Sequence, residues 1–245
     1  MIKNTADGIR SYGAAMRHIS KHGMWAYILL PGLLCLVLGG IIISAAWGFS
    51  DDLGGLISNF WKWDFGKPAV EKIVQVFGGL LILAFGAVFF KQIIMVVLAP
   101  FMSILSEKVE KQLTGEISQR SFSVGRALSD IVRGLRIATR NIIRELLATV
   151  FLLLIGLVPT FAPFTTVLIF LIQSYYAGFG NMDYTLERHF SYKNSIRFVK
   201  KNRGLALGNG IVFMLLFFTV IGFLFALPLG TVAATIQTVK KLENK

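Results

Sequence analysis

The residues best suited to chemistry are arginines that recur along one segment. Arg133, Arg136 and Arg140 are spaced three or four positions apart within residues 120–145. A guanidinium group binds oxyanions through paired N–H donors, and a cleft lined by such groups concentrates anions. These three arginines are therefore candidate anion-binding residues. The alternative, which the sequence leaves open, is that they face the phosphate groups of lipids.

Two other pairs of side chains have spacings that occur at metal or acid–base sites. His18 and His22 stand four apart, so on a helix they would share one face, as zinc ligands do. No acidic or cysteine partner lies close to them in the sequence, and we predict no metal site. Glu107 and Glu110 are each followed directly by a lysine, which favours an ion-paired surface.

Motifs of the common enzyme classes are absent from the sequence. It contains no GxSxG, Walker loop, dinucleotide fingerprint or HExxH. Its single cysteine excludes an intramolecular disulfide and a multi-cysteine metal or redox site. We therefore predict neither an enzyme nor a bound cofactor.

The composition indicates a membrane protein. The 245 residues are 55% hydrophobic and only 16% charged, whereas soluble domains average about 25% charged residues. The mean hydropathy is +0.67, and the net charge is +12. No base-reading module separates the apolar regions, so nucleic acid is not an expected partner. We predict an all-α integral membrane protein with a single membrane domain over residues 1–245, in contact with the lipid bilayer.

Two apolar regions have the length of a long transmembrane helix. Residues 24–50 carry no charge and, at about 1.5 Å per residue, can cross a hydrocarbon core of about 30 Å. Residues 73–105 are interrupted only by Lys91, and they predict a tilted helix that adjusts at Pro100 and continues past the membrane surface. Lys91 is expected to extend toward the interface, with a protein-lined cavity as the alternative.

Two further apolar regions are uncharged, and they span residues 146–182 and 204–239. Pro159 and Pro163 interrupt the first, and Gly222 and Pro228 interrupt the second, which predicts two helical hairpins. Arms of roughly 16 residues would rise about 24 Å, less than the bilayer core, so we expect partly penetrating, re-entrant hairpins. Two full crossings per region stay open as the alternative. Backbone at that depth needs cover, which predicts a homo-oligomer or an internal pore.

The segment 120–145 has the pattern of an amphipathic helix. Its apolar positions step by three and four residues, and they are Val124, Leu128, Ile131, Leu135, Ala138 and Ile142. This spacing predicts a helix on the inner membrane surface.

The distribution of basic residues predicts the orientation. Of the 25 Lys and Arg residues, 21 fall in the segments 1–23, 106–145, 183–203 and after residue 239. Cytoplasmic segments accumulate Lys and Arg, so both termini are expected in the cytoplasm. This topology requires each hairpin to return to the side that it left.

Two sequence blocks resemble the CysZ family, the bacterial branch of the membrane proteins related to etoposide-induced proteins. The first block contains Ala99-Pro100-Phe101, Leu105-Ser106-Glu107-Lys108-Val109-Glu110 and Leu113-Thr114-Gly115. The second contains Asp183-Tyr184, His189, Phe190 and Arg197. The resemblance extends over almost the entire chain.

The resemblance implies a protein of sulfate uptake in the bacterial cytoplasmic membrane. It also implies a fold of two long transmembrane helices with two partly penetrating hairpins. Structural roles, rather than ion contacts, are expected for the motif residues Pro100, Phe101, Glu107, Asp183, Tyr184 and His189.

The resemblance also places an anion-binding turn before the first membrane helix, where the family has Gly-Leu/Ile-Arg. Here the turn begins at Gly23 and lacks the arginine, because Gly23 is followed by Met24 and Trp25. Backbone N–H groups of the turn, with charge from Arg17 or Lys21, are the remaining candidates for sulfate binding. We expect sulfate binding to be weakened or relocated.

Two functions remain open at this point. The first is an anion channel or permease, with sulfate as the ion that the resemblance suggests. The second is a non-transporting membrane protein that organises lipids or partners, which the missing arginine favours. Polar groups inside the apolar regions are few, and they are Lys91, Gln92, Gln173 and Asn209.

Overall fold

The computed structural model describes residues 2–48, 86, 89–91, 93–115 and 124–243, and no strand occurs among them. The labelled helices are α1 (Ile2–Lys21), α2 (Ala26–Gly48), α5 (Ala99–Thr114), α6 (Val124–Gly156), α7 (Ala162–His189), α8 (Tyr192–Lys201), α9 (Arg203–Phe217) and α10 (Val220–Glu243). A further helix, Phe89–Val97, precedes α5. The all-α prediction is confirmed for this part of the chain. The predicted loop 51–72 and the first part of the region 73–105 lie outside the described residues.

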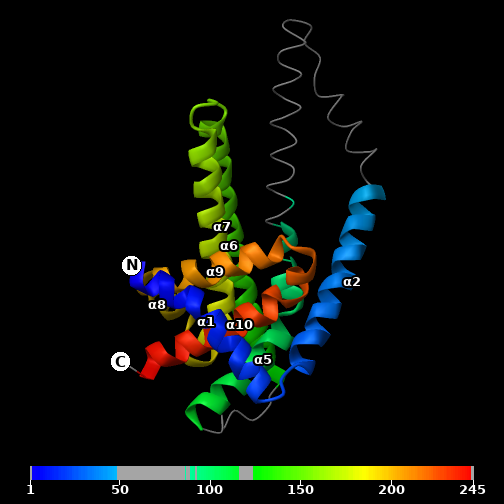
Figure 1. The fold of residues 1–245 in the computed structure, drawn as a ribbon, viewed down its shortest axis with the longest axis vertical. Coiled ribbons are helices and arrows are strands. Elements are labelled where there is room, and N and C mark those ends of the chain that lie inside the picture. Colours follow the sequence, from blue (N-terminus) through cyan, green and yellow to red (C-terminus); the bar gives the residue numbers. More distant parts are fainter. Residues whose placement is uncertain (1, 49–85, 87–88, 92, 116–123, 244–245) are drawn as a thin grey trace, which may run out of the picture.

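Helices α6 and α7 form a long hairpin that stands upright in Figure 1, with α2 on the other side of the molecule. The turn between them contains Pro159, and Pro163 lies in the first turn of α7. Helix α6 continues without a break across residues 145 and 146, so the amphipathic segment and the first hairpin arm are one helix of 33 residues. The reason is local, because no proline occurs between Val124 and Gly156.

The buried face of α6 differs from the apolar stripe in the sequence. Leu135 of that stripe is 53% exposed. The buried side chains instead recur every four residues, and they are Ile137, Asn141, Glu145 and Thr149. Helix α6 thus turns polar groups toward α7 and apolar groups outward, which is the arrangement that a lipid environment favours.

The second hairpin is formed by α9 and α10, and it breaks at Thr219 rather than at the positions predicted. The Thr219 hydroxyl accepts a hydrogen bond of 3.0 Å from the Gly222 N–H and so caps α10. Pro228 lies inside α10 and does not end it, which corrects the prediction. A proline leaves the carbonyl four residues earlier without its helical donor. That carbonyl, of Leu224, packs against Gly32 of α2, where a Cβ would lie only 2.6 Å from its oxygen.

Helix α9 contacts its neighbours α1 and α7 through their backbones. A Cβ on Gly8 of α1 would lie 2.8 Å from the Leu205 carbonyl oxygen. Cβ atoms on Gly178 of α7 and Gly210 of α9 would both lie less than 3.0 Å from a backbone oxygen of the facing helix. Small residues at such crossings let membrane helices pack closely. The buried centre of the molecule is therefore built from backbone contacts as much as from side chains.

Two described helical stretches are long and apolar enough to cross a membrane, namely Ala162–His189 and Ile221–Glu243. Two bent pairs raise the total to four if each pair is one span. These are α1 with Ala26–Ile41, bent by 115°, and Phe89–Val97 with α5, bent by 62°. The second bend lies immediately before Pro100, which occupies the first turn of α5. The chain is a membrane protein.

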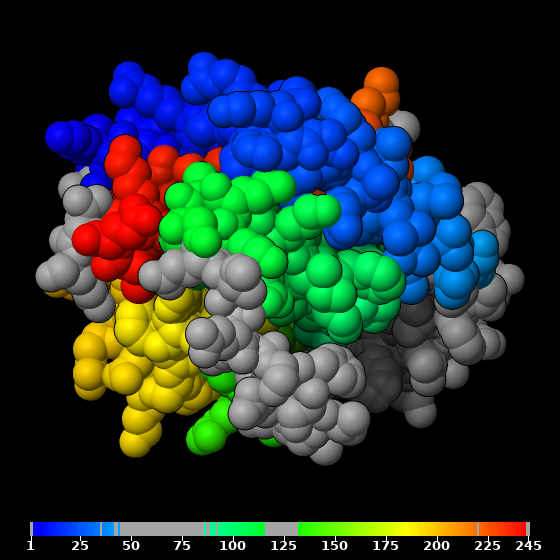
Figure 2. All heavy atoms as spheres, turned by 90° about the horizontal axis from the view of Figure 1, so that it is seen from below, coloured from blue at the N-terminus to red at the C-terminus, as the bar shows by residue number. Residues whose placement is uncertain are grey.

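Viewed from below, the molecule presents both of its ends on one face. Figure 2 shows the start of the chain in blue and the end of α10 in red close together, with α5 in green between α1, α2 and the yellow region of α8. The termini of the described chain therefore lie near each other.

Candidate functional site

A buried ion pair joins the helix Phe89–Val97 to α6. The Lys91 ammonium group contacts the Glu145 carboxylate, and the exposed fractions of the two side chains are 1% and 0%. Lys91 also donates a hydrogen bond of 3.3 Å to the backbone carbonyl of Gln173 in α7. Lys91 therefore does not extend to the interface, because its partner lies inside the helix assembly. The expected extension to the interface is wrong, and Lys91 instead forms a buried ion pair with Glu145.

Buried hydroxyl groups lie close to this pair along the chain. Thr149 follows Glu145 by one helical turn, and Ser174 follows Gln173 directly. Both side chains are fully buried. Among the described residues, neither hydroxyl oxygen has a hydrogen-bond partner. In the described part of the chain, two buried hydroxyl groups without a hydrogen-bond partner therefore lie close in sequence to the residues of this contact.

The remaining polar residues of the apolar regions have other roles. Asn209 of α9 is buried, accepts a hydrogen bond of 2.8 Å from Asn181 and donates one of 2.9 Å to the Gly230 carbonyl. It therefore links α7, α9 and α10. Gln92 lies outside the described residues.

The three predicted anion-binding arginines of α6 already have partners. Arg133 donates two hydrogen bonds to the Asp183 carboxylate, at 3.0 and 3.2 Å, and one of 2.6 Å to the Ser195 hydroxyl. Arg136 stacks over the ring of Tyr192, with 4.6 Å between guanidinium carbon and ring centroid. Arg140 donates a hydrogen bond of 2.7 Å to the Asn141 side chain. The structure thus directs these charges toward the protein itself.

The turn before α2 contains Gly23 in a conformation that favours glycine. Gly23 adopts a φ of +62°, in the left-handed region that favours glycine. Arg17 and Lys21 of α1 are exposed, and they lie six and two positions before Gly23. They lie on a different element from the α6 arginines.

His18 and His22 form contacts that need no metal. His18 Nε2 lies 2.8 Å from Gln112 Oε1, and His22 Nδ1 lies 2.9 Å from the His18 carbonyl oxygen. No group of three or more His, Cys, Asp or Glu side chains is arranged to hold a metal ion in the part of the chain that the structure describes.

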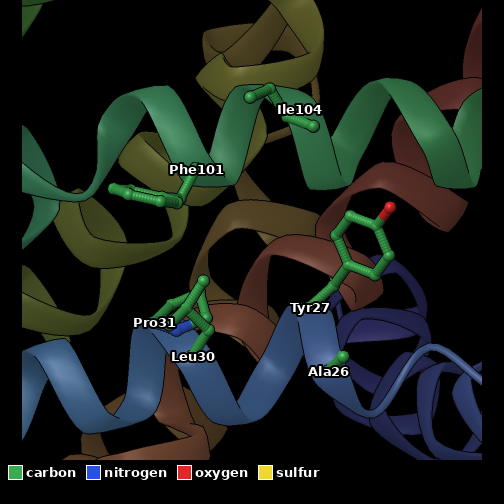
Figure 3. Close-up of a pocket in the computed structure, with 6 residues that line it drawn as sticks. All are labelled: Ala26, Tyr27, Leu30, Pro31, Phe101 and Ile104. Atoms are coloured by element: carbon green, nitrogen blue, oxygen red, sulfur yellow. The ribbon is translucent and has the colours of Figure 1, made fainter.

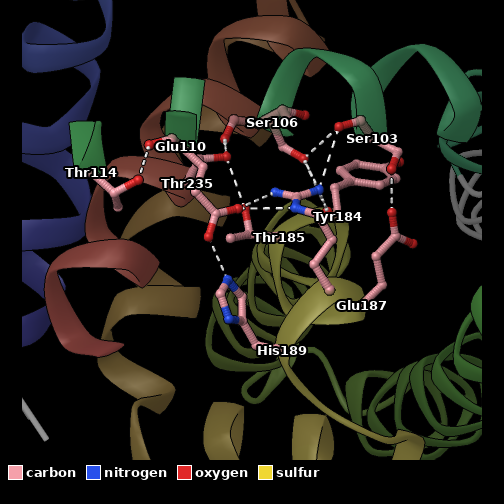
Figure 4. Close-up of polar contacts among 11 residues, drawn as sticks. Ser103, Ser106, Glu110, Thr114, Tyr184, Thr185, Glu187, His189 and Thr235 are labelled. Carbon is pink, nitrogen blue, oxygen red and sulfur yellow. Dashed lines mark hydrogen bonds and ion pairs between the residues drawn. The ribbon is translucent and has the colours of Figure 1, made fainter. Parts of the chain in front are cut away.

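The motif residues of α5 and α7 meet in one polar network (Figure 4). Arg188 donates hydrogen bonds of 2.7 and 2.9 Å to the Glu110 carboxylate and one of 2.8 Å to the Ser106 hydroxyl. His189 contacts the same carboxylate. The network therefore connects the end of α7 to α5.

Other motif residues strengthen the same junction. The Tyr184 hydroxyl donates a hydrogen bond of 2.7 Å to the backbone carbonyl of Met95. Glu187 contacts the Ser103 hydroxyl, and Glu107 is partly exposed one turn before Glu110. The structure assigns no ligand to any of these side chains.

An apolar pocket of about 320 Å³ lies between α2 and α5. Figure 3 shows Tyr27, Leu30 and Pro31 of α2 facing Phe101 and Ile104 of α5. Among the described residues, its lining contains no charged side chain, and Tyr27 is its one residue with a polar side-chain group, so the pocket has little to attract an anion. The pocket places Phe101 of the first motif at a helix interface.

Comparison with known proteins identifies the family. Residues 11–228 match the family described as sulfate transporter CysZ/etoposide-induced protein 2.4. The chain belongs to this family. A curated relative, named sulfate transporter CysZ and found in Vibrio parahaemolyticus serotype O3:K6 (strain RIMD 2210633), is 28% identical over 169 residues, which are 68% of each chain. The resemblance seen in the two sequence blocks is thereby confirmed.

Sequence reasoning missed one side chain of the buried pair. Glu145 is the last charged residue before the uncharged region, so the sequence places it at the membrane surface. Four apolar residues surround the charged pair Arg144-Glu145, and they are Ile142, Ile143, Leu146 and Leu147, an indication that could have placed Glu145 deeper. Its partner is separated from it by 54 positions, and no local spacing shows such a contact.

Proposed function

We propose that this protein is an anion channel or permease of the bacterial cytoplasmic membrane, and that sulfate is its substrate. Family membership over residues 11–228 carries this proposal. The relative named a sulfate transporter and the apolar helices support it, and an enzymatic function has no support from either.

The depth of the buried ion pair fits a transport function. From the start of α7, Gln173 lies about 17 Å along the helix and Asp183 about 15 Å further, at 1.5 Å per residue. If α7 crosses the membrane, the Lys91–Glu145 pair therefore lies near the middle of the hydrocarbon core. Ionisable groups at that depth are costly and mark pathways for ions or substrates.

The test is the flux of labelled sulfate into proteoliposomes that contain the purified protein. We expect uptake above that of protein-free vesicles made from the same lipids. A matched set of vesicles containing an unrelated helical membrane protein controls for leakage. Uptake equal to both controls would contradict transport.

The alternative, a membrane protein that organises lipids or partners without transport, has one specific observation in its favour. This observation is that the α6 arginines contact protein groups, and it adds to the missing arginine of the family's anion-binding turn. Absence of flux from correctly folded protein would favour this alternative.

Sulfate binding at the Gly23 turn, with charge from Arg17 or Lys21, can be tested separately. We expect Arg17→Ala or Lys21→Ala to weaken sulfate binding, because Gly23 alone supplies only backbone donors. Isothermal titration of the purified protein with sulfate measures the difference. Equal heats in both variants and the wild type would remove these residues from the site.

We also propose a topology in which both termini lie in the cytoplasm and both hairpins return to that side. Uncharged residues 162–182 of α7 rise about 31 Å, enough for a full crossing, whereas the 15 residues of α9 rise only about 22 Å. The α6–α7 hairpin then crosses. The α9–α10 hairpin is proposed to be re-entrant because α9 is too short to cross, although α10 alone has the length of a span. A homo-oligomer would cover the exposed apolar faces of the first hairpin.

A further inference from the structure

We propose that Lys91 binds a small inorganic oxyanion inside the membrane. Glu145 competes with this anion for the Lys91 ammonium group, and the anion replaces the Glu145 carboxylate when it binds. This inference rests on the proposed function, which supplies sulfate as the anion. In the structure the site is closed, because the carboxylate of Glu145 occupies the position of the anion.

The position of the pair supports a role beyond holding helices together. A fully buried ion pair contributes little net stability, because the cost of removing both charges from water offsets their attraction. An apolar pair of similar size would join the helix Phe89–Val97 to α6 at least as well. The chain nevertheless keeps two charges where their exposed fractions are 1% and 0%.

Two buried hydroxyl groups lie close along the chain to the residues that Lys91 contacts, and each could donate a hydrogen bond to an oxyanion. The Thr149 hydroxyl, one turn beyond Glu145, and the Ser174 hydroxyl, next to Gln173, are fully buried. Neither has a hydrogen-bond partner among the described residues. Each hydroxyl group can donate one hydrogen bond, and buried polar groups without partners are costly. An anion at Lys91 would give such donors an acceptor.

The local charge also favours an anion. Tyr176 of α7 lies in the electric field of Glu145 and of two arginines of α6, Arg140 and Arg144. Around Tyr176, the positive side chains of Arg140 and Arg144 therefore outnumber the negative side chain of Glu145. When an anion replaces the carboxylate, Glu145 remains on the same helix as the two arginines, which compensate its charge.

Binding measurements test the inference directly. We compare sulfate binding to the purified wild type, to Glu145→Gln and to Glu145→Gln/Lys91→Met by isothermal titration. We expect Glu145→Gln to lower the Kd by about tenfold or more, corresponding to at least 1.4 kcal/mol, because the competing carboxylate is gone. The gain is expected to vanish in the double variant. No gain in Glu145→Gln, or a gain that persists without Lys91, would overturn the inference.

A second double variant separates transport from folding. Lys91→Met/Glu145→Met replaces the pair by apolar side chains and is expected to keep the fold, as checked by size-exclusion chromatography and thermal unfolding. We expect its sulfate flux in proteoliposomes to fall to the level of protein-free vesicles. Flux equal to that of a transporting wild type would overturn the inference. A wild type without flux, combined with tighter binding in Glu145→Gln, would instead overturn the proposed function and support the anion site.

Discussion

At the scale of single residues, Arg133 connects three helices through one guanidinium group. It lies on α6, its two carboxylate contacts are to Asp183 on α7, and its hydroxyl contact is to Ser195 on α8. Arg133 and Asp183 are only 12% and 9% exposed. Removing one member leaves the other buried without its counter-charge, which costs far more than the pair contributes.

We therefore expect Arg133→Met to lower the free energy of unfolding by about 3 kcal/mol. Chemical unfolding in detergent, followed by circular dichroism, measures the change. Arg136→Met is the matched control, because Arg136 is exposed and its stacking over Tyr192 contributes only about 0.5–1 kcal/mol. Equal decreases in the free energy of unfolding of the two variants would show that the contact of Arg133 with Asp183 does not contribute specifically to stability.

At the scale of helices, the contacts of α9 leave no room for side chains at its crossings. A Cβ on Gly178 of α7 would overlap the backbone oxygen of Ala206, which cannot move without displacing α9. We expect Gly178→Ala to destabilise the protein by about 1–3 kcal/mol. Gly134→Ala is the control, since nothing lies within 4 Å of a Cβ there and alanine favours the helix by up to about 1 kcal/mol. Thermal unfolding of both variants should therefore shift in opposite directions.

A second helix contact depends on the proline inside α10. The Leu224 carbonyl, left free by Pro228, fits against Gly32 of α2, and any Cβ at residue 32 would push the two helices apart. We expect Gly32→Ala to lower the thermal unfolding midpoint and Gly40→Ala on the same helix to leave it unchanged or raise it, since the space at Gly40 is open. A similar decrease in both variants would indicate that α2 itself, and not this contact, is sensitive to substitution.

At the scale of the whole molecule, the two hairpins are expected to reach different depths. We expect Thr160→Cys, at the tip of the α6–α7 hairpin, to react with a membrane-impermeant thiol reagent from outside intact cells. Phe218→Cys, at the tip of the shorter hairpin, is expected to stay unlabelled from outside. Both variants are made in a Cys35→Ser background. Labelling of neither tip would support two re-entrant hairpins, and labelling of both would support two full crossings.

Much of the architecture follows from run lengths of uncharged residues. The region 24–50 contains α2, and Pro159 lies in the turn of the first hairpin. The break of the second hairpin was misplaced, because α10 tolerates Pro228 once Gly32 packs against the freed carbonyl. Such tolerance depends on a residue almost 200 positions away, so local breaker rules do not detect it.

The candidate site was less predictable than the fold. Lys91 and Arg133 were visible in the sequence as charges, but their roles depend on Glu145 and Asp183, which come from other helices. The inward face of α6 also carries polar residues, whereas a rule made for water-soluble helices expects apolar ones there. The roles of Lys91 and Arg133 therefore depend on contacts between helices, which the spacing of residues within one helix does not show.

The contacts of α1 have a consequence for biosynthesis. Helix α1 packs against α9 and α10, so it is synthesised well before the two helices that cover its buried face. At roughly 5–20 residues per second, ribosomes need on the order of 10 to 40 s to add the intervening chain. During that interval α1 is a nascent segment without its final neighbours, exposed to chaperones and proteases. The packing of α1 is thus completed only after α9 and α10 have been synthesised.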